Sequence, residues 1–492
     1  MKESIIIIPV FLPILFGVGL LAFRGIENHD YYKKLTELIV IINTLIIWMI
    51  LINQIGREGF EVFSFNSFLN VYFRLDGMGM VFTGLVSFLW PFATLYAFEY
   101  MEHSLNQRSF FGFYTMTYGV TVAIAMAGNI VTLYIFYEML TLVTFPLVLH
   151  YKDRESRNAA IYYLIYSIGG ATCAFIGMIF MVMRAGNGIF QYGGFLDSSR
   201  TENMNLLLLV YVLCFFGFGV KAAIFPLHRW LPRASVAPTP VTALLHAVAV
   251  VKAGAFSILR LTYYCYGKDM LAGSWAQKIV AAFVMVTIIH GSSMAVKEIH
   301  FKRRLAYSTV SNLSYILLGA VMMCPAGLVA ALSHLVIHAF TKITSFFCAG
   351  AVMHKTNRHY IYELDGLGHR MPVTFTCFTI ASLSLMGVPL FAGFISKWNI
   401  AQAALENGGV IGIAGIGVLL FSALLTAIYM LTVVIRAFFP GGDFDYDTIK
   451  DCQDPSWRML LPIILFSFII IVLGVCSGPL LSFLELIAKG GI

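Results

Sequence analysis

Charged residues are scarce in this chain. Aspartate, glutamate, lysine and arginine make up only 12% of its 492 residues, while hydrophobic residues make up 59%. Soluble globular proteins carry roughly twice that share of charge, about 25%. The scarcity excludes a soluble domain held by a single anchor, because apolar runs recur from one end of the chain to the other. The composition therefore predicts a polytopic membrane protein.

Clustered metal ligands and phosphate-binding loops are also lacking. The eight cysteines stand singly, with no C-x-x-C pair and no Cys/His ligand spacing. Iron–sulfur clusters and structural zinc use such clusters, so we expect neither a metal nor a cofactor in this chain. The patterns G-x-G-x-x-G after a strand and G-x-x-x-x-G-K-[ST] are absent as well. We predict no catalytic residue here, and any linked redox chemistry would belong to another subunit.

Long apolar runs are what the chain has in abundance. A helix needs about 20 mainly apolar residues to cross a bilayer, and about fourteen runs meet that length. These runs are 4–23, 35–54, 77–100, 111–128, 129–149, 159–183, 204–225, 240–263, 277–296, 304–324, 326–353, 372–398, 409–437 and 459–486. The first has no convincing cleavage site, so we take it as a helix and not as a signal peptide. The stretch 60–75 alternates apolar and polar residues and predicts an extracytoplasmic hairpin.

The basic residues predict the topology. Loops on the side opposite the N-terminus hold roughly twice as many lysines and arginines, which marks that side as cytoplasmic. Both termini are then extracytoplasmic, in a multi-pass protein of the cell (plasma) membrane. The net charge of +7 is dispersed over these loops. It therefore predicts orientation in the bilayer and no binding of nucleic acid.

Two of the predicted spans contain helix breakers beside a lysine. Pro226 follows Lys221 in the seventh span, and Gly387-Val388-Pro389 precedes Lys397 in the twelfth. Both patterns predict broken helices, which membranes tolerate inside protein or beside a wet cavity. If helices 4–8 and 9–13 are two five-helix units, their odd number inverts one relative to the other. The predicted division is 1–110 (helices 1–3 with the hairpin), 111–263 (first repeat), 264–437 (second repeat) and 438–492 (loop and helix 14).

Ionisable residues inside the spans carry the functional argument. A charge at the centre of a membrane helix costs at least ~2.5–3.5 kcal/mol, so such residues mark pathways for charge. They are Glu138 and the lysines Lys221, Lys252, Lys342 and Lys397. A desolvated lysine can lose its proton, whereas arginine stays protonated. Glu138 is either the partner of Lys221 or a protonated carboxyl bonded to a neighbour such as Thr141.

Histidines extend this set. His334, His338 and Lys342 follow at i, i+4 and i+8, which places them on one helix face. Neutral imidazole can take a proton on one nitrogen and release one from the other, so the stripe predicts a relay. The alternative is that each histidine binds a backbone carbonyl; a metal would need a third ligand that this helix lacks. His246 and Lys252 share the eighth span and could hand protons onward, unless Lys252 snorkels to the surface.

Several blocks resemble a known family. The segment 221–260, KAAIFPLHRWLPRASVAPTPVTALLHAVAVVKAGAFSILR, resembles the signature of the antiporter-like membrane subunits of respiratory complex I, shared with Mrp-type cation/proton antiporters and membrane-bound hydrogenases. KRRLAYSTVSNLSYILLG, SHLVIHAFTKITSFFCAGAVMH, LDGLGHRMP and GVPLFAGFISKW resemble further family blocks in the expected order. The resemblance covers most of residues 70–440. It implies a fourteen-helix core with two inverted five-helix repeats and a charged axis through the membrane middle.

The resemblance also implies roles for individual residues. By motif, Glu138 resembles the family's glutamate of helix five, Lys221 its partner on helix seven, His246 and Lys252 the linking residues of helix eight, His334, His338 and Lys342 the stripe of helix eleven, and Lys397 the terminal lysine of helix twelve. The chain departs from the family pattern at His300, where an acidic residue is usual, and at Asn312 and Ser314. None of these departures touches the proposed axis.

The expected function is ion translocation, of protons first and sodium second, by a subunit that does no redox chemistry itself. The resemblance implies sister antiporter-like subunits and redox subunits with iron–sulfur clusters, as in a NADH/ferredoxin-quinone dehydrogenase or a membrane-bound hydrogenase. Three alternatives stay open: a subunit of a multisubunit Mrp-type Na⁺/H⁺ antiporter without a redox partner, a quinone-reducing enzyme, and a structural membrane spacer. The sequence does not decide between H⁺ and Na⁺, or name the electron donor.

Overall fold

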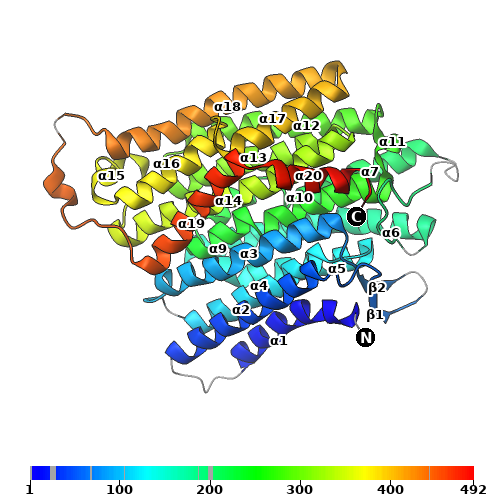
Figure 1. The fold of residues 1–492 in the computed structure, drawn as a ribbon, viewed down its shortest axis with the longest axis horizontal. Helices are drawn as coiled ribbons and strands as arrows, with labels where there is room; N and C mark the ends of the chain where they lie inside the picture. The colour runs from blue at the N-terminus through cyan, green and yellow to red at the C-terminus, as the bar shows by residue number, and fades with distance from the viewer. Residues whose placement is uncertain are drawn as a thin grey trace.

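Helices make up most of the computed structural model (Figure 1). It describes residues 3–22, 29–66, 69–104, 106–186, 188–197, 203–442 and 444–491. Phe23, the last residue of the first predicted span, lies outside these ranges. The first and last described residues lie toward the same end of the helix bundle (Figure 1).

The elements follow the predicted spans closely. The first half contains a 3₁₀ turn (Glu3–Ile7), α1 (Ile8–Ala22), α2 (His29–Ile52), β1 (Phe60–Ser64), β2 (Asn70–Phe73), α3 (Gly77–Tyr100), α4 (Gln107–Ala125), α5 (Ile130–Val148), α6 (Arg154–Ala185), α7 (Met204–Gly219), α8 (Trp230–Ala234), α9 (Thr239–Ala247) and α10 (Val250–Arg260), followed by a π-helical turn (Leu261–Tyr266). The second half contains α11 (Lys268–Leu271), α12 (Trp275–Lys297), α13 (Phe301–Val321), α14 (Pro325–Thr356), α15 (Leu367–Arg370), α16 (Pro372–Met386), α17 (Ala392–Asn407), α18 (Gly409–Phe438), α19 (Trp457–Val475) and α20 (Gly478–Ala488), with 3₁₀ turns at Ile361–Glu363 and Tyr446–Ile449. The two strands pair antiparallel, which confirms the predicted hairpin.

Side-chain caps fix where several helices start. The Asn129 side chain accepts from the N–H of Thr132 at the start of α5, and Asp153 accepts from the N–H of Ser156 at the start of α6. These bonds satisfy backbone donors that have no partner within the helix. The hydrogen bond from the Ser156 N–H also lowers the pKa of the exposed Asp153 carboxyl.

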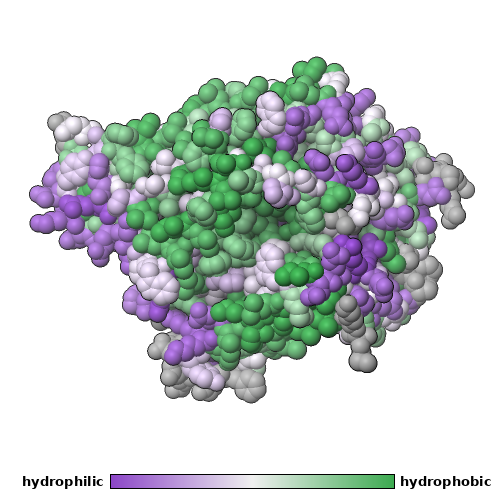
Figure 2. Space-filling model, viewed as in Figure 1, coloured by the Kyte–Doolittle hydropathy of each residue, from purple (hydrophilic) through white to green (hydrophobic). Residues whose placement is uncertain are grey.

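The polytopic membrane class is confirmed. Ten helices of the described chain are long and apolar enough to cross a bilayer, and α7, α16 and α20 are shorter apolar helices. Figure 2 shows hydrophobic residues in a broad band across the middle of the visible face, with hydrophilic residues gathered at both ends. α14 lies at the centre and packs against α9, α13, α16, α17 and α19. The domain boundaries and the inverted repeats stay predictions.

Both predicted helix breaks are present. α7 ends at Gly219, and the chain runs irregularly until α8 begins at Trp230. Side chains satisfy the freed backbone there: the Trp230 indole donates to the Val220 carbonyl at 2.8 Å, and Thr287 accepts from the Phe225 N–H at 2.9 Å. α16 ends at Met386 with Gly387 in the left-handed region (φ +90°), where glycine is favoured.

The span predicted over 240–263 is present as Thr239–Tyr266, but it is interrupted inside. The chain leaves the helical conformation at Val248 and Ala249, so α9 and α10 are separate and His246 and Lys252 lie on different pieces. The N–H groups of Val248 and Ala249 both bond to the Leu244 carbonyl, which closes α9 with a tight turn. Neither proline nor glycine marks this break. The last predicted span is likewise interrupted, between α19 and α20.

Candidate ion pathway

The predicted lysines and histidines are buried among helices. The exposed fraction of each of these side chains is below a tenth: Lys221 0%, His246 0%, Lys252 0%, His334 3%, His338 1%, Lys342 0% and Lys397 7%. Glu138 is half-buried. Full burial of Lys252 rules out the alternative in which it snorkels to the surface.

Lys221 lies in the break after α7 and contacts α5. Its amine donates to the carbonyl of Tyr137 and lies 3.5 Å from the centroid of the Tyr137 ring. Ion pairs between described residues do not include Glu138 with Lys221. Tyr137, and not Glu138, is therefore the residue of α5 to which the Lys221 amine bonds.

The Glu138 carboxyl has no hydrogen bond within the described chain. Its Oε1 is buried without a partner, and so is the Thr141 hydroxyl that was its alternative partner. Leu142, four residues further along α5, is 64% exposed, so this face of the helix is not covered by the chain itself. The structure therefore forms neither of the two contacts expected for Glu138. The carboxyl and the Lys221 amine remain within range of an electrostatic interaction.

A direct contact joins α10 to α14. The Lys252 amine lies 2.5 Å from Nδ1 of His338. If both groups were protonated, both would be donors and no hydrogen bond could form between them. The contact therefore requires one neutral group, so the pair carries one proton fewer than its maximum. Because the contact links a lysine to an imidazole, the pair is able to accept or release a proton without rearranging.

The next group on α14 is His334, but no hydrogen bond joins it to His338, because Nε2 of each ring is buried without a partner among the described residues. The rings of His338 and His334 stack with centroids 5.7 Å apart, and His334 Nδ1 lies 2.8 Å from the hydroxyl of Ser396. Ser396 directly precedes Lys397 on α17. The Lys397 amine donates to the carbonyls of Leu385 (2.6 Å) and Met386 (3.1 Å). These carbonyls end α16 and have no partner within that helix, so the cation fills the break.

Lys342 and His246 do not join this series. The Lys342 amine turns to α13, where it binds the Ser308 hydroxyl (2.6 Å) and the Leu305 carbonyl (3.2 Å). Tyr429 of α18 donates to the same Ser308 hydroxyl. Among the residues that the structure describes, both ring nitrogens of His246 are buried without a partner, and its ring packs against Phe346. The predicted stripe on α14 is thus divided between two sets of contacts.

Several residues of the site carried no separate signal in the sequence. Ser396 and Tyr137 stand next to the predicted Lys397 and Glu138, and attention to neighbours of buried charges could have found them. Ser308 and Tyr429 reach Lys342 from other helices, so only the tertiary fold reveals them. Within the described part of the chain, no group of three or more His, Cys, Asp or Glu side chains could hold a metal ion.

Arg260, at the end of α10, is a buried structural group and not an interfacial anchor. It is fully buried and pairs with Asp76, which also caps α3 through the N–H of Gly79. Both carboxylate oxygens accept from the guanidinium. This bidentate pair fixes α10 to α3 at the end of the bundle opposite the loop between α7 and α8.

The fold and the buried amines define a class: polytopic membrane proteins with titratable groups connected through their interior. A family described as "NADH:quinone oxidoreductase/Mrp antiporter, TM" matches residues 127–426, more than half of the sequence. The chain belongs to this family.

Relatives and solved structures agree with that assignment. NAD(P)H-quinone oxidoreductase subunit 5 of Paulinella chromatophora is 29% identical over 96% of this chain and 76% of that protein. Na⁺/H⁺ antiporter subunit A1 of Staphylococcus aureus (strain JH9) is 30% identical over 84% of this chain, which spans 53% of that subunit. The fold matches the Mrp complex from Dietzia sp. DQ12-45-1b (TM-score 0.86, 20% identity, 99% and 97% coverage) and the membrane-bound sulfane sulfur reductase, an archaeal respiratory membrane complex (0.85, 21%, 98% and 96%).

Proposed function

We propose that this chain translocates protons through the series Lys252, His338, His334, Ser396 and Lys397. The observation that carries the proposal is the buried contact between Lys252 and His338, continued by the histidine stack and by the Ser396 hydroxyl. Each member can take a proton on one side and release one on the other, or hold one reversibly. A purely structural spacer would not need such groups.

Charge balance supports a transport role for the lysines. Among the residues predicted for the pathway only Glu138 is acidic, and Lys252, Lys342 and Lys397 have no carboxylate partner within the described chain. Full protonation of all these groups would bury several unpaired cations, which is costly. We therefore propose that some side chains of the series are unprotonated at any time, and that an unprotonated side chain accepts the next proton.

Glu138 and Lys221 are proposed to control entry to the series. No hydrogen bond among described residues joins Lys221 to Lys252 or His246, so a proton crosses this gap only after a side-chain movement or through bridging water. A change in the pairing of Glu138 with Lys221 alters whether the amine holds its proton. We place the control step at this gap.

The assembly is proposed to include other membrane subunits. The Glu138 carboxyl is only half-buried, and Leu142, four residues further along α5, is exposed, so this face of α5 would be costly in lipid and calls for a neighbouring chain to cover it. Subunits with iron–sulfur clusters would make the complex redox-driven; their absence would make it an Mrp-type antiporter. We propose a cell-membrane location with both termini outside, supported by the distribution of basic residues.

The experiment reconstitutes the purified complex in vesicles and follows internal pH and radioactive sodium separately. We expect proton movement in the native complex and its loss in Lys252→Met. Lys278→Met, at an exposed position of α12, is the matched control and should transport normally. Normal proton movement in Lys252→Met, or movement of sodium alone, would reject the proposal. Identification of the companion chains in the same preparation decides between the redox-driven and the Mrp-type assembly.

A further inference from the structure

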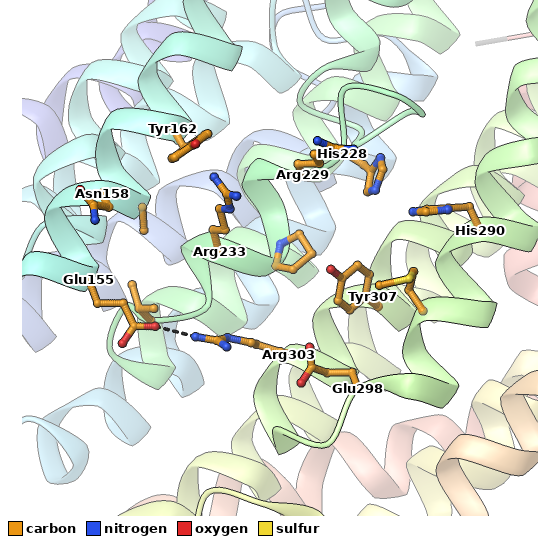
Figure 3. Close-up of a pocket in the computed structure, with 14 residues that line it drawn as sticks. Glu155, Asn158, Tyr162, His228, Arg229, Arg233, His290, Glu298, Arg303 and Tyr307 are labelled. Atoms are coloured by element: carbon orange, nitrogen blue, oxygen red, sulfur yellow. Dashed lines mark hydrogen bonds and ion pairs between the residues drawn. The ribbon is translucent and has the colours of Figure 1, made fainter.

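A cavity of about 660 Å³ opens beside the broken seventh helix, away from the buried lysines. α6, α8, α12 and the start of α13 surround it (Figure 3). Its wall contains three arginines, Arg229, Arg233 and Arg303, on the side where basic residues predict the cytoplasm. This concentration of guanidinium groups is independent of the proposed proton series.

Two of the three arginines have no anionic partner. Arg303 pairs with Glu155 at 2.5 Å, and the other acidic wall residue, Glu298, accepts from the N–H of His300. Glu298 forms no ion pair among the described residues, so the three arginines of the wall exceed its two carboxyls by one charge. Among described residues, Arg229 and Arg233 form no ion pair and no hydrogen bond, and both are exposed to the cavity.

A ring contact holds one of these two groups in place. The Arg233 guanidinium stacks on the ring of Tyr162 at 3.7 Å from the centroid, as Figure 3 shows. Arg229 and Arg233 are four residues apart, so they project from the same side of the short α8 segment. Next to Arg229, Nδ1 of the buried His228 has no partner in the described part of the chain, and its ring lies 4.6 Å from that of His290 between centroids. The cavity therefore offers fixed donors for an anion with several acceptor oxygens.

Apolar stripes lead from the cavity into the membrane region. On α6, Tyr162 is followed on the same face by Ile165, which is 64% exposed. On α12, His290 is preceded one turn earlier by Val286, which is 46% exposed. A soluble anion would gain nothing from these stripes, whereas the chains of a lipid could lie along them. Basic pockets between membrane helices on the cytoplasmic side are suited to acidic lipid headgroups.

We propose that this cavity binds an anionic phospholipid, with its phosphate between Arg229 and Arg233 and its chains along the exposed faces of α6 and α12. The lipid would fill the space beside the broken helix, and the single negative charge of its phosphate would offset one of the two positive charges there. Planar guanidinium groups bind phosphate oxygens through paired hydrogen bonds, which lysine cannot reproduce.

The test titrates phosphatidylglycerol into the delipidated complex in neutral detergent and counts bound lipid by native mass spectrometry. The double variant R229Q/R233Q should bind this lipid about 30-fold more weakly, from roughly a fivefold loss per arginine. Arg370→Gln, at an exposed arginine on the same side and outside the cavity, is the control and should bind as the native complex does. Melting curves recorded without lipid check that both variants remain folded.

Two further binding measurements distinguish an anionic lipid from a soluble anion as the ligand. Phosphatidylcholine, which has a phosphate but no net charge, should bind more weakly than phosphatidylglycerol. Free glycerol phosphate should not compete at concentrations where the lipid saturates. Equal lipid affinity of R229Q/R233Q and the native complex would overturn the proposal. Competition by glycerol phosphate as strong as that by the lipid would overturn it too, because the site would then belong to a soluble anion.

Discussion

The two broken helices of this chain carry a lysine each, yet they use it differently. Lys397 binds the carbonyls that its own break leaves free, and the preceding residue, Ser396, bonds to His334 of α14. Lys221 binds a carbonyl of another helix, α5, and has no such link. The same local pattern therefore gives two different ends of the proposed proton series: a connected end at Lys397 and an isolated end at Lys221. The isolated end is where transfer can be controlled.

The largest effect is expected at the isolated end. Lys221→Ala removes the amine that interacts electrostatically with Glu138, so coupled proton transport should fall at least ~100-fold, the scale of a lost proton-transfer group. Assembly should survive, because the Tyr137 carbonyl keeps its bond within α5. Vesicle acidification measures transport, and gel filtration measures assembly. Transport near the native rate in an assembled variant would place the control step elsewhere.

Stability should distinguish the two lysines. Lys397→Met leaves the carbonyls of Leu385 and Met386 without donors inside the bundle, at a cost of about 1–3 kcal/mol. Lys221→Met leaves no carbonyl without a donor, because the Tyr137 carbonyl keeps its bond within α5. The melting temperature of the complex in detergent should therefore drop more for Lys397→Met than for Lys221→Met. The reverse order would contradict the assigned contacts.

A smaller effect is expected at the link itself. Ser396→Ala removes the hydroxyl between His334 and the α17 break, and transport should slow by about fivefold, the equivalent of one neutral hydrogen bond. Ser396→Thr keeps a hydroxyl and serves as the control. Equal rates for the alanine and threonine variants would show that His334 releases its proton by another route.

The smallest effect concerns His300, in the loop between α12 and α13. Burial, with the nearby charges of Arg303 and Lys302, lowers the pKa of His300 to about 4. The unfolded chain takes up a proton near pH 6.5 and the folded chain does not, so stability is lost as pH falls from about 6.5 to 4. His300→Gln should weaken this pH dependence of the melting temperature. An unchanged slope would mean that His300 titrates normally.

Much of the fold follows from local pattern. The polytopic helical class, the hairpin and the two breaks at Pro226 and Gly387 are confirmed, because length, hydropathy and helix-breaking residues act over short distances. The break at Val248 and Ala249 was not predictable, since no glycine or proline marks it and the turn depends on packing.

The site was predictable in composition but not in its connections. Buried charges are visible in the sequence because they are costly in a membrane. Which group each amine meets depends on helices that are distant in sequence. Lys342 thus turns to Ser308, although its spacing aligns it with His338.

The central claim is that protons pass through the contact between Lys252 and His338. His338→Gln tests it most directly: the glutamine oxygen can still accept from the Lys252 amine, but an amide cannot take up and release a proton. The measurement is the rate of proton uptake by vesicles that contain the complex. We predict a loss of at least ~100-fold with the complex intact. A rate within about twofold of the native one would contradict the pathway, since a group that can be bypassed so easily does not relay the proton.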